Sequence, residues 1–459
     1  MMQLPESFLQ EMRDLLGEEY GVWLSSYGQS PAQGLRIHSG KLAPGQWERM
    51  TSFPTDPVPW TTNGYYLPEG ERLSRHPWYY AGLYYIQEPS AMAPAALLPV
   101  KPGDRVLDLC AAPGGKSTEL GVRLQGEGLL VSNDLSHSRA KALLRNMERF
   151  GIRNLCVTSE TPEKLADTFG AWFDAILVDA PCSGEGMFRR DPDLIRSWEE
   201  RGPSYYAPIQ QSILEQAVRM LRPGGYLLYS TCTFSKAEDE DVVHALLGRM
   251  PEMELSPLPL FDGACGGMDG EPVLRLFPHR VRGEGHFAAL FCKRGAAGRQ
   301  EPLSSSDVEA TTDRRTIGRL ERETDFLVWE SMLDQPFDRR RLMMRDDMLF
   351  LLPDGFDRAW KLRYLRSGLF VGSRKGARFE PSQAVAMTLR PKGFAQTISF
   401  SAKDERVIRY LKGETVFPDA DVRLSRGWVL VCVDDFPLGW AKYTGNALKN
   451  KYDAGWRMS

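Results

Sequence analysis

Between residues 100 and 295 the chain alternates short apolar runs with longer amphipathic stretches, a pattern typical of strands joined by helices. The apolar runs predict strands over Arg105–Leu109, Leu129–Ser132, Leu155–Thr158, Asp174–Asp179, Gly225–Ser230 and Phe287–Cys292. The amphipathic stretches predict helices over Lys116–Leu124, Ser136–Phe150, Pro208–Leu221 and Lys236–Leu247. This alternation predicts an α/β fold with a doubly wound, mostly parallel sheet, and the late run HFAALFCK is expected as an antiparallel edge strand.

The two flanks of this region have different patterns. Near the N-terminus, apolar residues at helical spacing predict an amphipathic helix (Phe8, Met12, Leu15 and Leu16). After the sheet region, a stretch rich in Ser, Thr and charge predicts a linker, and strand-rich sequence with frequent turn residues predicts a compact β-barrel-like module at the end. We therefore expect five parts: an N-terminal domain over 1–95, the sheet domain over 96–295, a linker over 296–325, a small mixed domain over 326–386, and the β-rich module over 387–459.

The 459 residues have the composition of an ordinary soluble protein, with 42% hydrophobic residues, 25% charged residues and a net charge of −3. No apolar run reaches transmembrane length, and the N-terminus lacks the apolar region of a signal peptide. We expect a cytoplasmic protein without a membrane partner. Seven cysteines without a pairing rhythm, six scattered histidines and no CxxC argue against a disulfide framework and a metal site.

A glycine-rich turn follows the first predicted strand of the sheet. The run RVLDL ends in an acidic residue, and Pro113-Gly114-Gly115 then turn the chain into a helix. The second strand ends at Asp134, which suits the two hydroxyls of a ribose. Because neither GxGxxG nor GxxxxGK[ST] is present, the turn favours an adenosine cofactor without phosphates, such as S-adenosylmethionine. The alternative is a tight turn that binds no ligand.

Two cysteines, 50 residues apart in the sequence, each come just after a predicted strand. Cys182 lies in Asp-Ala-Pro-Cys-Ser-Gly and Cys232 in Ser-Thr-Cys-Thr-Phe. A nucleophilic thiol, a second thiol and a cofactor site on one sheet predict covalent catalysis on an electrophilic ring. The alternative for any free cysteine is a small buried apolar residue, which stays open for Cys110. The same alternative is expected of the remaining four cysteines (Cys156, Cys265, Cys292 and Cys432).

Three motifs carry a resemblance to a known family. In DLCAAPGGKSTEL, DAPCSGEGMFRRDP and LLYSTCTFSKAEDE the chain resembles the NOL1/NOP2/Sun family of RNA cytosine-5 methyltransferases over roughly residues 20–295. The tail GWVLVCVDDFPLGWAKYTGNALKNKYDAGWRMS looks like the PUA-like RNA-binding domain of the bacterial members, and the whole architecture is similar to the RsmF/YebU type, which methylates 16S ribosomal RNA. The resemblance implies a Rossmann-like class I methyltransferase sheet between an N-terminal RNA-binding domain and this tail.

The same resemblance implies a role for each residue of the site. It implies Cys232 as the nucleophile that adds to C6 of the cytosine, Cys182 as the thiol that assists product release, and Asp179 as a group that binds the ring and the cofactor. For S-adenosylmethionine it implies contacts from the loop (Cys110, Ala111, Ala112, Pro113, Gly114, Gly115 and Lys116), from Asp134, and from Glu160 as the candidate for the adenine amino group. From the residues alone, Lys116 is open between a ligand contact and a simple helix start.

Basic residues at two places are candidates for RNA contacts. Arg189 and Arg190 follow the PCSGEG loop, and phosphate neutralisation supplies most nucleic-acid affinity. The region from 387 holds 12 Lys and Arg against 8 Asp and Glu, with basic residues (Lys442, Lys449 and Lys451) between aromatic ones (Tyr443, Tyr452 and Trp456). Those aromatic residues are equally expected as the core of a small domain.

The expected partner is RNA, specifically 16S ribosomal RNA or the small ribosomal subunit, and a monomer is favoured. Two other functions stay open. A non-catalytic RNA-binding or ribosome-assembly factor would keep the fold without the reaction. A DNA cytosine-5 methyltransferase would place the attack on the cysteine of the Pro-Cys pair, Cys182, instead of on Cys232.

Overall fold

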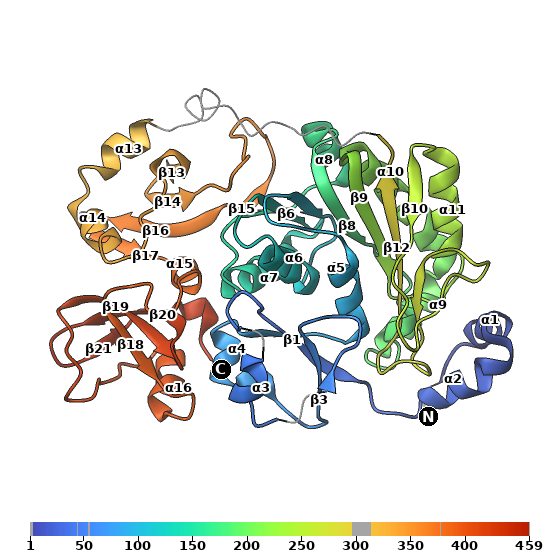
Figure 1. Cartoon of the computed structure of the whole chain (residues 1–459), viewed down its shortest axis with the longest axis horizontal. Helices are drawn as coiled ribbons and strands as arrows, with labels where there is room; N and C mark the ends of the chain where they lie inside the picture. Colours follow the sequence, from blue (N-terminus) through green and yellow to red (C-terminus); the bar gives the residue numbers. More distant parts are fainter. Residues whose placement is uncertain (1–2, 44, 54–55, 296–313, 377, 459) are drawn as a thin grey trace.

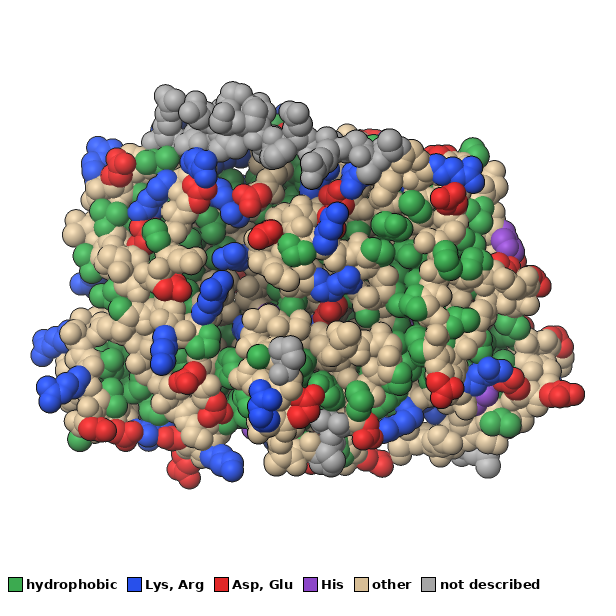
Figure 2. Space-filling model, in the orientation of Figure 1, with side chains coloured by type: hydrophobic (Ala, Val, Ile, Leu, Met, Phe, Trp, Pro, Cys, Tyr) green, Lys and Arg blue, Asp and Glu red, His purple; other side chains and the backbone are tan. Residues whose placement is uncertain are grey.

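The computed structural model describes residues 3–43, 45–53, 56–295, 314–376 and 378–458 (Figure 1). Four sheets follow one another along the chain, and the second of them is a large central sheet. Figure 2 shows acidic and basic side chains interspersed over the visible face. None of the helices in the described part of the chain has the length and apolar character that a bilayer span requires.

The N-terminal part begins with the expected amphipathic helix. Helix α1 buries Phe8 and Met12 against Phe188 and Trp198 of the sheet domain, which explains their helical spacing. A small antiparallel sheet follows, in the order β2-β3-β1-β4. The elements are α1 (Glu6–Leu16), α2 (Tyr20–Ser26), β1 (Gln33–Ile37), α3 (Gln46–Met50), β2 (Asp56–Pro57), β3 (Gly64–Leu67), α4 (Pro77–Tyr80) and β4 (Tyr84–Ile86).

The central sheet has the order β10-β12-β9-β8-β5-β6-β7-β15, with β11 paired to β12. Strands β5 to β9 are parallel, and β12 is antiparallel to β9 as expected, with β10 on its outer side. Its strands are β5 (Arg105–Asp108), β6 (Leu129–Asn133), β7 (Leu155–Thr158), β8 (Phe173–Asp179), β9 (Leu221–Thr231), β10 (Met253–Ser256), β11 (Leu274–Leu276) and β12 (His286–Lys293). The predicted doubly wound α/β sheet is therefore confirmed.

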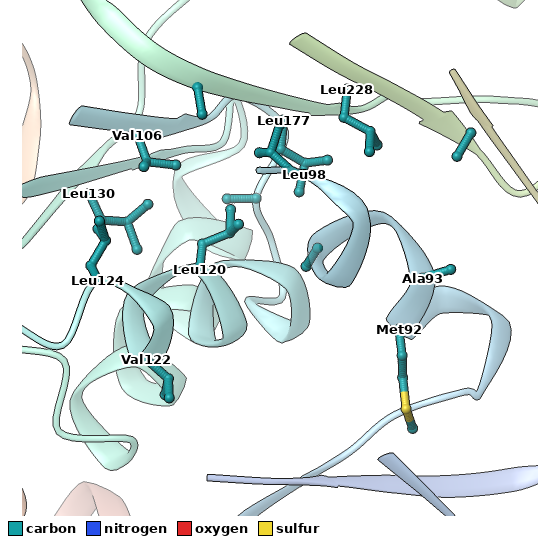
Figure 3. Packing of buried hydrophobic residues seen from close by; sticks show 14 of the residues in the cluster. Met92, Ala93, Leu98, Val106, Leu120, Val122, Leu124, Leu130, Leu177 and Leu228 are labelled. Atoms are coloured by element: carbon teal, nitrogen blue, oxygen red, sulfur yellow. The ribbon is translucent and has the colours of Figure 1, made fainter. Parts of the chain in front are cut away.

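Successive residues of a strand point to opposite faces of the sheet, and here both sets are apolar. Both faces are therefore covered by helices. Val106 and Leu130 pack with Leu120 of α6 on one face (Figure 3), whereas Leu107 and Leu129 belong to the core on the other face. The helices are α5 (Ala93–Leu97), α6 (Gly115–Arg123), α7 (His137–Arg149), α8 (Pro162–Phe169), α9 (Asp193–Glu200), α10 (Pro203–Met220) and α11 (Glu240–Arg249).

The region after the sheet domain contributes a strand to the central sheet. Strand β15 pairs antiparallel with β7 at its edge, while the rest of this region forms the sheet β13-β14-β16-β17. The elements are α13 (Arg314–Leu320), α14 (Thr324–Glu330), β13 (Leu342–Arg345), β14 (Met348–Leu351), β15 (Tyr364–Ser367), β16 (Leu369–Lys375) and β17 (Arg378–Pro381). Most of the linker expected over 296–325 lies outside the described residues, and α13 occupies part of the remainder.

The last sheet, β18-β19-β20-β21, packs against the first one. Apolar residues of both belong to one core, among them Trp47 and Tyr84 from the N-terminal part and Val431 and Leu448 from the end of the chain. The C-terminus accordingly lies beside α3 and α4 in Figure 1. The elements are α15 (Gln383–Met387), β18 (Thr397–Phe400), α16 (Glu405–Leu411), β19 (Gly427–Val433), β20 (Phe436–Tyr443) and β21 (Leu448–Asn450).

Candidate active site

The carboxyl ends of the parallel strands bring the predicted groups to one edge of the central sheet. Strand β5 ends at Asp108, β8 ends at Asp179, and β6 and β9 are followed by Asp134 and Cys232 respectively. The strand order reverses beside β5, because β6 and β7 lie on one side of it and β8 and β9 on the other. Ligands of doubly wound sheets bind outside such a reversal.

The loop after β5 is fixed against the carboxylate of Asp134. The Ala112 N–H donates to Asp134 Oδ2 at 3.2 Å, and the Ser136 N–H donates to Asp134 Oδ1 at 2.9 Å. Gly114 precedes α6 with a φ of +112°, a conformation that residues with a side chain rarely adopt. The buried carboxylate therefore has a defined orientation beside the loop. The loop contains the other residues expected at a cofactor site: Cys110, Ala111, Pro113, Gly115 and Lys116.

Asp108 is a buried carboxyl group with one unused oxygen. Its Oδ2 accepts a hydrogen bond from Ser117 Oγ at 2.6 Å, whereas Oδ1 has no partner among the described residues. Burial raises the pKa of Asp108 to about 7. An orphaned buried oxygen beside a glycine turn is what a missing hydrogen-bonding ligand leaves behind. Sequence reasoning noticed this acidic strand end without assigning Asp108 to the site.

Cys182 and Cys232 face each other, with 3.4 Å between their sulfur atoms. Both are free thiols and both are partly exposed. The following residues join the two loops again, since Ser183 Oγ and Thr233 Oγ1 share a hydrogen bond of 2.9 Å. The hydrogen bond with Cys232, together with burial, raises the pKa of Cys182 well above its ordinary value. The two thiols thus share one S–H···S hydrogen bond, in which either sulfur can be the donor.

Two buried glutamates, Glu185 and Glu238, accept hydrogen bonds from the loops that carry the thiols. Glu185 Oε2 accepts from Thr233 Oγ1 at 2.8 Å, and Glu238 Oε2 accepts from the Ser183 N–H at 3.0 Å and from Gln210 Nε2 at 2.8 Å. Burial raises the pKa of Glu238 to about 7. The sequence analysis missed both residues, although the motifs PCSGEG and FSKAEDE contain them.

A buried arginine fixes the segment that follows Cys232. Arg275 forms an ion pair with Glu240 and lies 3.1 Å from Asp239, and its Nη1 donates to the Phe234 carbonyl at 3.0 Å. Asp239 in turn accepts from Thr231 Oγ1 at 2.6 Å. This cluster ties strand β11 to both flanks of Cys232, so it determines the position of the thiol without contacting it.

Asp179 is the polar centre of the site. Its Oδ2 accepts from Lys116 Nζ at 2.7 Å and its Oδ1 from Ser230 Oγ at 2.8 Å, while His286 Nε2 lies 3.5 Å from Oδ1. Burial alone would raise the pKa of Asp179. The charge of Lys116 and the contact with His286 lower it by more than burial raises it, so the net shift of the pKa is strongly downward. Burial lowers the pKa of Lys116, whereas Asp179 and then Cys232 raise it, with a net rise. Lys116 therefore does more than begin a helix.

His286 is a further residue that the sequence analysis missed. Phe287 pairs with Thr231 in antiparallel register, which places His286 level with Cys232 on the neighbouring strand. The ring is buried, and its Nδ1 has no hydrogen-bond partner among the described residues. The strand HFAALFCK was predicted, but its register against β9 depends on the long segment between Thr231 and His286, whose path no local pattern specifies.

Glu160 lies at the end of β7 but its carboxylate is already occupied. Arg363, just before β15, donates to it through its backbone N–H at 2.7 Å and its Nε at 3.1 Å. This carboxylate attaches β15 to the sheet, and the contact with an adenine amino group expected of Glu160 stays a prediction. Cys110 lies in the loop and is partly exposed, and burial raises the pKa of its thiol well above the ordinary value.

The Arg189 side chain is largely buried and donates hydrogen bonds to other groups of the protein. Its Nε donates to Glu284 at 2.8 Å, Nη1 to the Ser26 carbonyl at 2.6 Å and Nη2 to the Gly283 carbonyl at 3.1 Å, and 6% of the side chain is exposed. The expected phosphate contact is therefore corrected for Arg189. Arg190 is exposed and donates once, to the Ala32 carbonyl at 2.9 Å.

The basic residues of the last sheet lie on neighbouring strands. Lys442 of β20 pairs with Lys449 of β21, and Lys442 Nζ lies 4.6 Å from the ring centre of Trp428. Lys451 Nζ is 3.7 Å from Glu380. The Tyr452 and Trp456 side chains are buried in the core, which is the alternative that the sequence left open for them. Tyr443 is partly exposed.

Models of protein families match four successive parts of the chain. The N-terminal domain of 16S rRNA methyltransferase RsmF matches residues 4–89, and 16S rRNA methyltransferase RsmB/F matches residues 95–292. The first C-terminal domain of RsmF rRNA methyltransferase matches residues 328–389, and the methyltransferase RsmF PUA domain matches residues 397–458.

Individual relatives span nearly the whole chain. Ribosomal RNA small subunit methyltransferase F of Erwinia tasmaniensis is 30% identical over 98% of this chain and 95% of its own length, and that of Cronobacter sakazakii is 31% identical over the same shares. Among solved structures, a methyltransferase homologue from Pyrococcus horikoshii has a TM-score of 0.57 and 28% identity, covering 64% of this chain and 96% of its own. NSun6 from the same organism, solved with SFG, has a TM-score of 0.56 and 22% identity, covering 64% and 99%, and shows the fold alone.

Proposed function

Because the chain belongs to the RsmB/F family of 16S ribosomal RNA methyltransferases, we propose that it methylates carbon 5 of a cytosine through a covalent bond between Cys232 and carbon 6 of the ring. The cofactor in this proposal is S-adenosylmethionine, and the substrate is 16S ribosomal RNA, free or within the small subunit. The observation that supports it best is the pair of thiols 3.4 Å apart beside the carboxylate of Asp179.

The strand ends fit an adenosine cofactor that lacks phosphates. In the proposal, Asp134 binds the ribose hydroxyls, because its buried carboxylate is already oriented by two backbone N–H groups. Asp108 has an unpartnered oxygen beside the loop, and Lys116 is paired with Asp179 instead of lying in a phosphate cradle. When bound, S-adenosylmethionine supplies a methyl group on a positively charged sulfur.

Cys232 begins the reaction because cytosine carbon 5 is too weak a nucleophile to be methylated directly. The electron pair of the Cys232 thiolate forms a bond to carbon 6, which moves ring electrons toward carbon 5 and ring nitrogen 3. Nitrogen 3 takes up a proton from solvent as this charge develops, and the Asp179 carboxylate accepts hydrogen bonds from that N–H and from the exocyclic amine. The lowered pKa of Asp179 keeps it an anion for this task. The enriched carbon 5 then takes up the methyl group. The proton on nitrogen 3 returns to solvent when the ring double bond re-forms.

Cys182 completes the reaction by accepting the proton from carbon 5. The electrons of the carbon–hydrogen bond re-form the ring double bond, and the bond between carbon 6 and Cys232 breaks, returning its electron pair to sulfur. The main cause of the raised pKa of Cys182 is its hydrogen bond with Cys232, and this cause is lost once Cys232 is bonded to carbon. Burial still raises the pKa of Cys182 at that stage. In the proposal Cys182 acts as a thiolate after its own proton has left to solvent, and it then takes the proton of carbon 5.

The test is a methyl-transfer assay with product identification. We expect the protein with S-adenosylmethionine to produce 5-methylcytosine in 16S ribosomal RNA, measured by mass spectrometry of the digested nucleosides, with free RNA and assembled small subunits compared. Cys232→Ala should give no product, whereas Cys292→Ala, at the far end of β12, should behave as wild type. Methylation at another ring position, or product from Cys232→Ala, would contradict the proposal.

A further inference from the structure

A cavity of about 870 Å³ lies at the junction of three parts of the chain, on the edge of the central sheet opposite the thiols. Loops at the amino ends of β5, β6 and β7 form one wall, with Lys101, Gln125 and Arg153. The other walls come from the segment after β1 and from the segments around Arg390 and Phe436. Strands β5, β6 and β7 are four or five residues long, so about 13–17 Å separates the two edges of the sheet along these three strands.

The Lys and Arg side chains that line the junction cavity have no acidic counterparts in the lining. It contains no Asp or Glu among the described residues, and its cationic side chains are Lys41, Lys101, Arg123, Arg153 and Arg390. This composition differs from the interspersed charges of the face in Figure 2 and from the net charge of −3 of the whole chain. Positive charge is therefore concentrated here in a way that the overall composition does not predict.

Two of the five cations are committed to the protein. Arg123 donates to the carbonyls of Leu98, at 2.7 Å, and Val100, at 3.2 Å, and thereby caps the segment that follows α5. Lys41 Nζ donates to the Ala81 carbonyl at 2.9 Å. Arg123 raises the local potential without being able to reach far into solvent. Burial lowers the pKa of Lys41 to about 7, so this side chain contributes only part of a positive charge near neutral pH.

The other three cations, Lys101, Arg153 and Arg390, are exposed, and none forms an ion pair with a described carboxylate. The buried Asp104 accepts the backbone N–H of Lys101 and also feels the charge of the Lys101 ammonium, although the two form no ion pair. Another basic cavity of the molecule is different: Arg280 there is paired with Glu19, and Arg282 with Asp56. The junction cavity thus presents three long cations around one concave surface, and none of them forms an ion pair with a described residue.

We propose that the junction cavity is a second RNA-binding surface, which contacts phosphates of the substrate away from the target cytosine; this rests on the proposed function. RNA is favoured over an acidic protein because a structured RNA must continue beyond the reaction site, and because part of the wall, Phe436 and Pro437, belongs to the PUA domain. Charge without base-specific groups positions a nucleic acid and does not select its sequence.

The test compares two triple variants with the same change in net charge. Lys101→Gln, Arg153→Gln and Arg390→Gln together remove the exposed cations of the cavity. Lys164→Gln, Arg219→Gln and Arg249→Gln remove three exposed cations from α8, α10 and α11 on the other face of the sheet. The probe is 16S ribosomal RNA made by transcription, and its Kd is measured over a range of salt concentrations.

We expect the cavity variant to bind RNA at least tenfold more weakly near physiological salt, and its slope of log K against log salt to fall by about 2–3, at about 0.7–0.9 per lost contact. Its kcat at saturating RNA and its S-adenosylmethionine affinity should equal those of wild type. A Kd and a slope equal to those of the control variant would overturn the proposal. A cavity that binds an acidic protein instead of RNA would give this same result. If wild type binds RNA but does not methylate cytosine, the proposed function fails separately from this test.

Discussion

The sulfur atoms of Cys182 and Cys232 lie 3.4 Å apart although 50 residues separate them in the chain. The contact depends on groups other than the thiols themselves: Ser183 bonds to Thr233, and Glu185 bonds to the loop after Cys232. Removing either sulfur leaves this support in place. Differences between the two cysteine variants therefore report chemistry and not a collapse of the site.

The two thiols should have opposite phenotypes. Cys182→Ala can still attack carbon 6 but lacks the base that removes the proton, so it should accumulate a covalent protein–RNA complex, seen as a slow band on a denaturing gel. Cys232→Ala should bind RNA and form no such band. If the reaction instead follows the DNA-type order, the phenotypes exchange, with Cys182→Ala losing the adduct and Cys232→Ala remaining active. A non-catalytic RNA-binding factor would give no adduct with either variant.

Asp134→Ala should weaken the binding of S-adenosylmethionine. The variant leaves ribose hydroxyls without an acceptor in a buried site, which costs about 1–3 kcal/mol, or roughly 5- to 150-fold in affinity. Calorimetric titration measures it directly. Asp167→Ala, whose carboxylate is exposed on α8, is the control and should bind as wild type. Unchanged affinity in Asp134→Ala would exclude this carboxylate as the ribose ligand.

Lys116→Met should shift the acid limb of the pH–rate profile upward. Lys116 lowers the pKa of Asp179, and burial, which raises it, remains when the ammonium is removed. The carboxylate then takes up a proton at a higher pH, so activity should begin to fall at a pH higher by about 1–3 units. The profile of kcat against pH measures the shift. A slower enzyme with an unmoved acid limb would mean that Lys116 acts elsewhere.

Arg275→Met should destabilise the protein substantially. The change leaves the buried carboxylates of Asp239 and Glu240 without their cation, which typically costs about 3–5 kcal/mol in the free energy of unfolding. Arg294→Met breaks an exposed pair with Glu254 and should cost at most about 1 kcal/mol. Denaturant titration of both variants tests the contrast, and equal midpoints would contradict the positioning role given to Arg275.

Replacing Lys442, Lys449 and Lys451 by Ala should weaken RNA binding and its salt dependence without affecting cofactor binding. Lys449 is exposed, whereas Lys442 lies over Trp428 and Lys451 lies near Glu380, so Lys449→Ala should account for most of the loss. Filter binding at several salt concentrations measures it. Deleting the chain from residue 387 is a poorer test, because it would also expose the core shared with the first sheet. If the triple variant binds RNA with wild-type affinity, these three lysines do not contribute to RNA binding.

Local patterns predicted the central sheet and the groups at its strand ends because parallel order puts every carboxyl end at one edge. Parallel order brings Asp134, Asp179, Cys182 and Cys232 to this edge, and the hydrogen bonds of Ser183 and Glu185 then fix the two thiol loops against each other. Helix α8 was missed, although Thr161 caps it and Pro162 begins it, because its apolar pattern covers only two turns.

Residues whose partners come from distant segments could not be predicted in this way. Arg189 looked like a phosphate ligand, yet its acceptors lie in Ser26 and in the segment before β12. Glu160 is bound by Arg363, 203 residues later. In each case the sequence places a charged side chain near the end of a strand or loop of the site. Its hydrogen-bond partners come from a distant segment of the chain, and no local pattern predicts where that segment lies.

The indole N–H of Trp78 donates to Asp434 at 2.7 Å, across 356 residues of chain. During synthesis, at about 5–20 residues per second, the ribosome needs roughly 20–70 s between these two residues. Throughout that interval the first sheet, with Trp47 and Tyr84, has one apolar face uncovered. The segment made first is thus the last to be enclosed, and a chain released early leaves an aromatic surface open to aggregation.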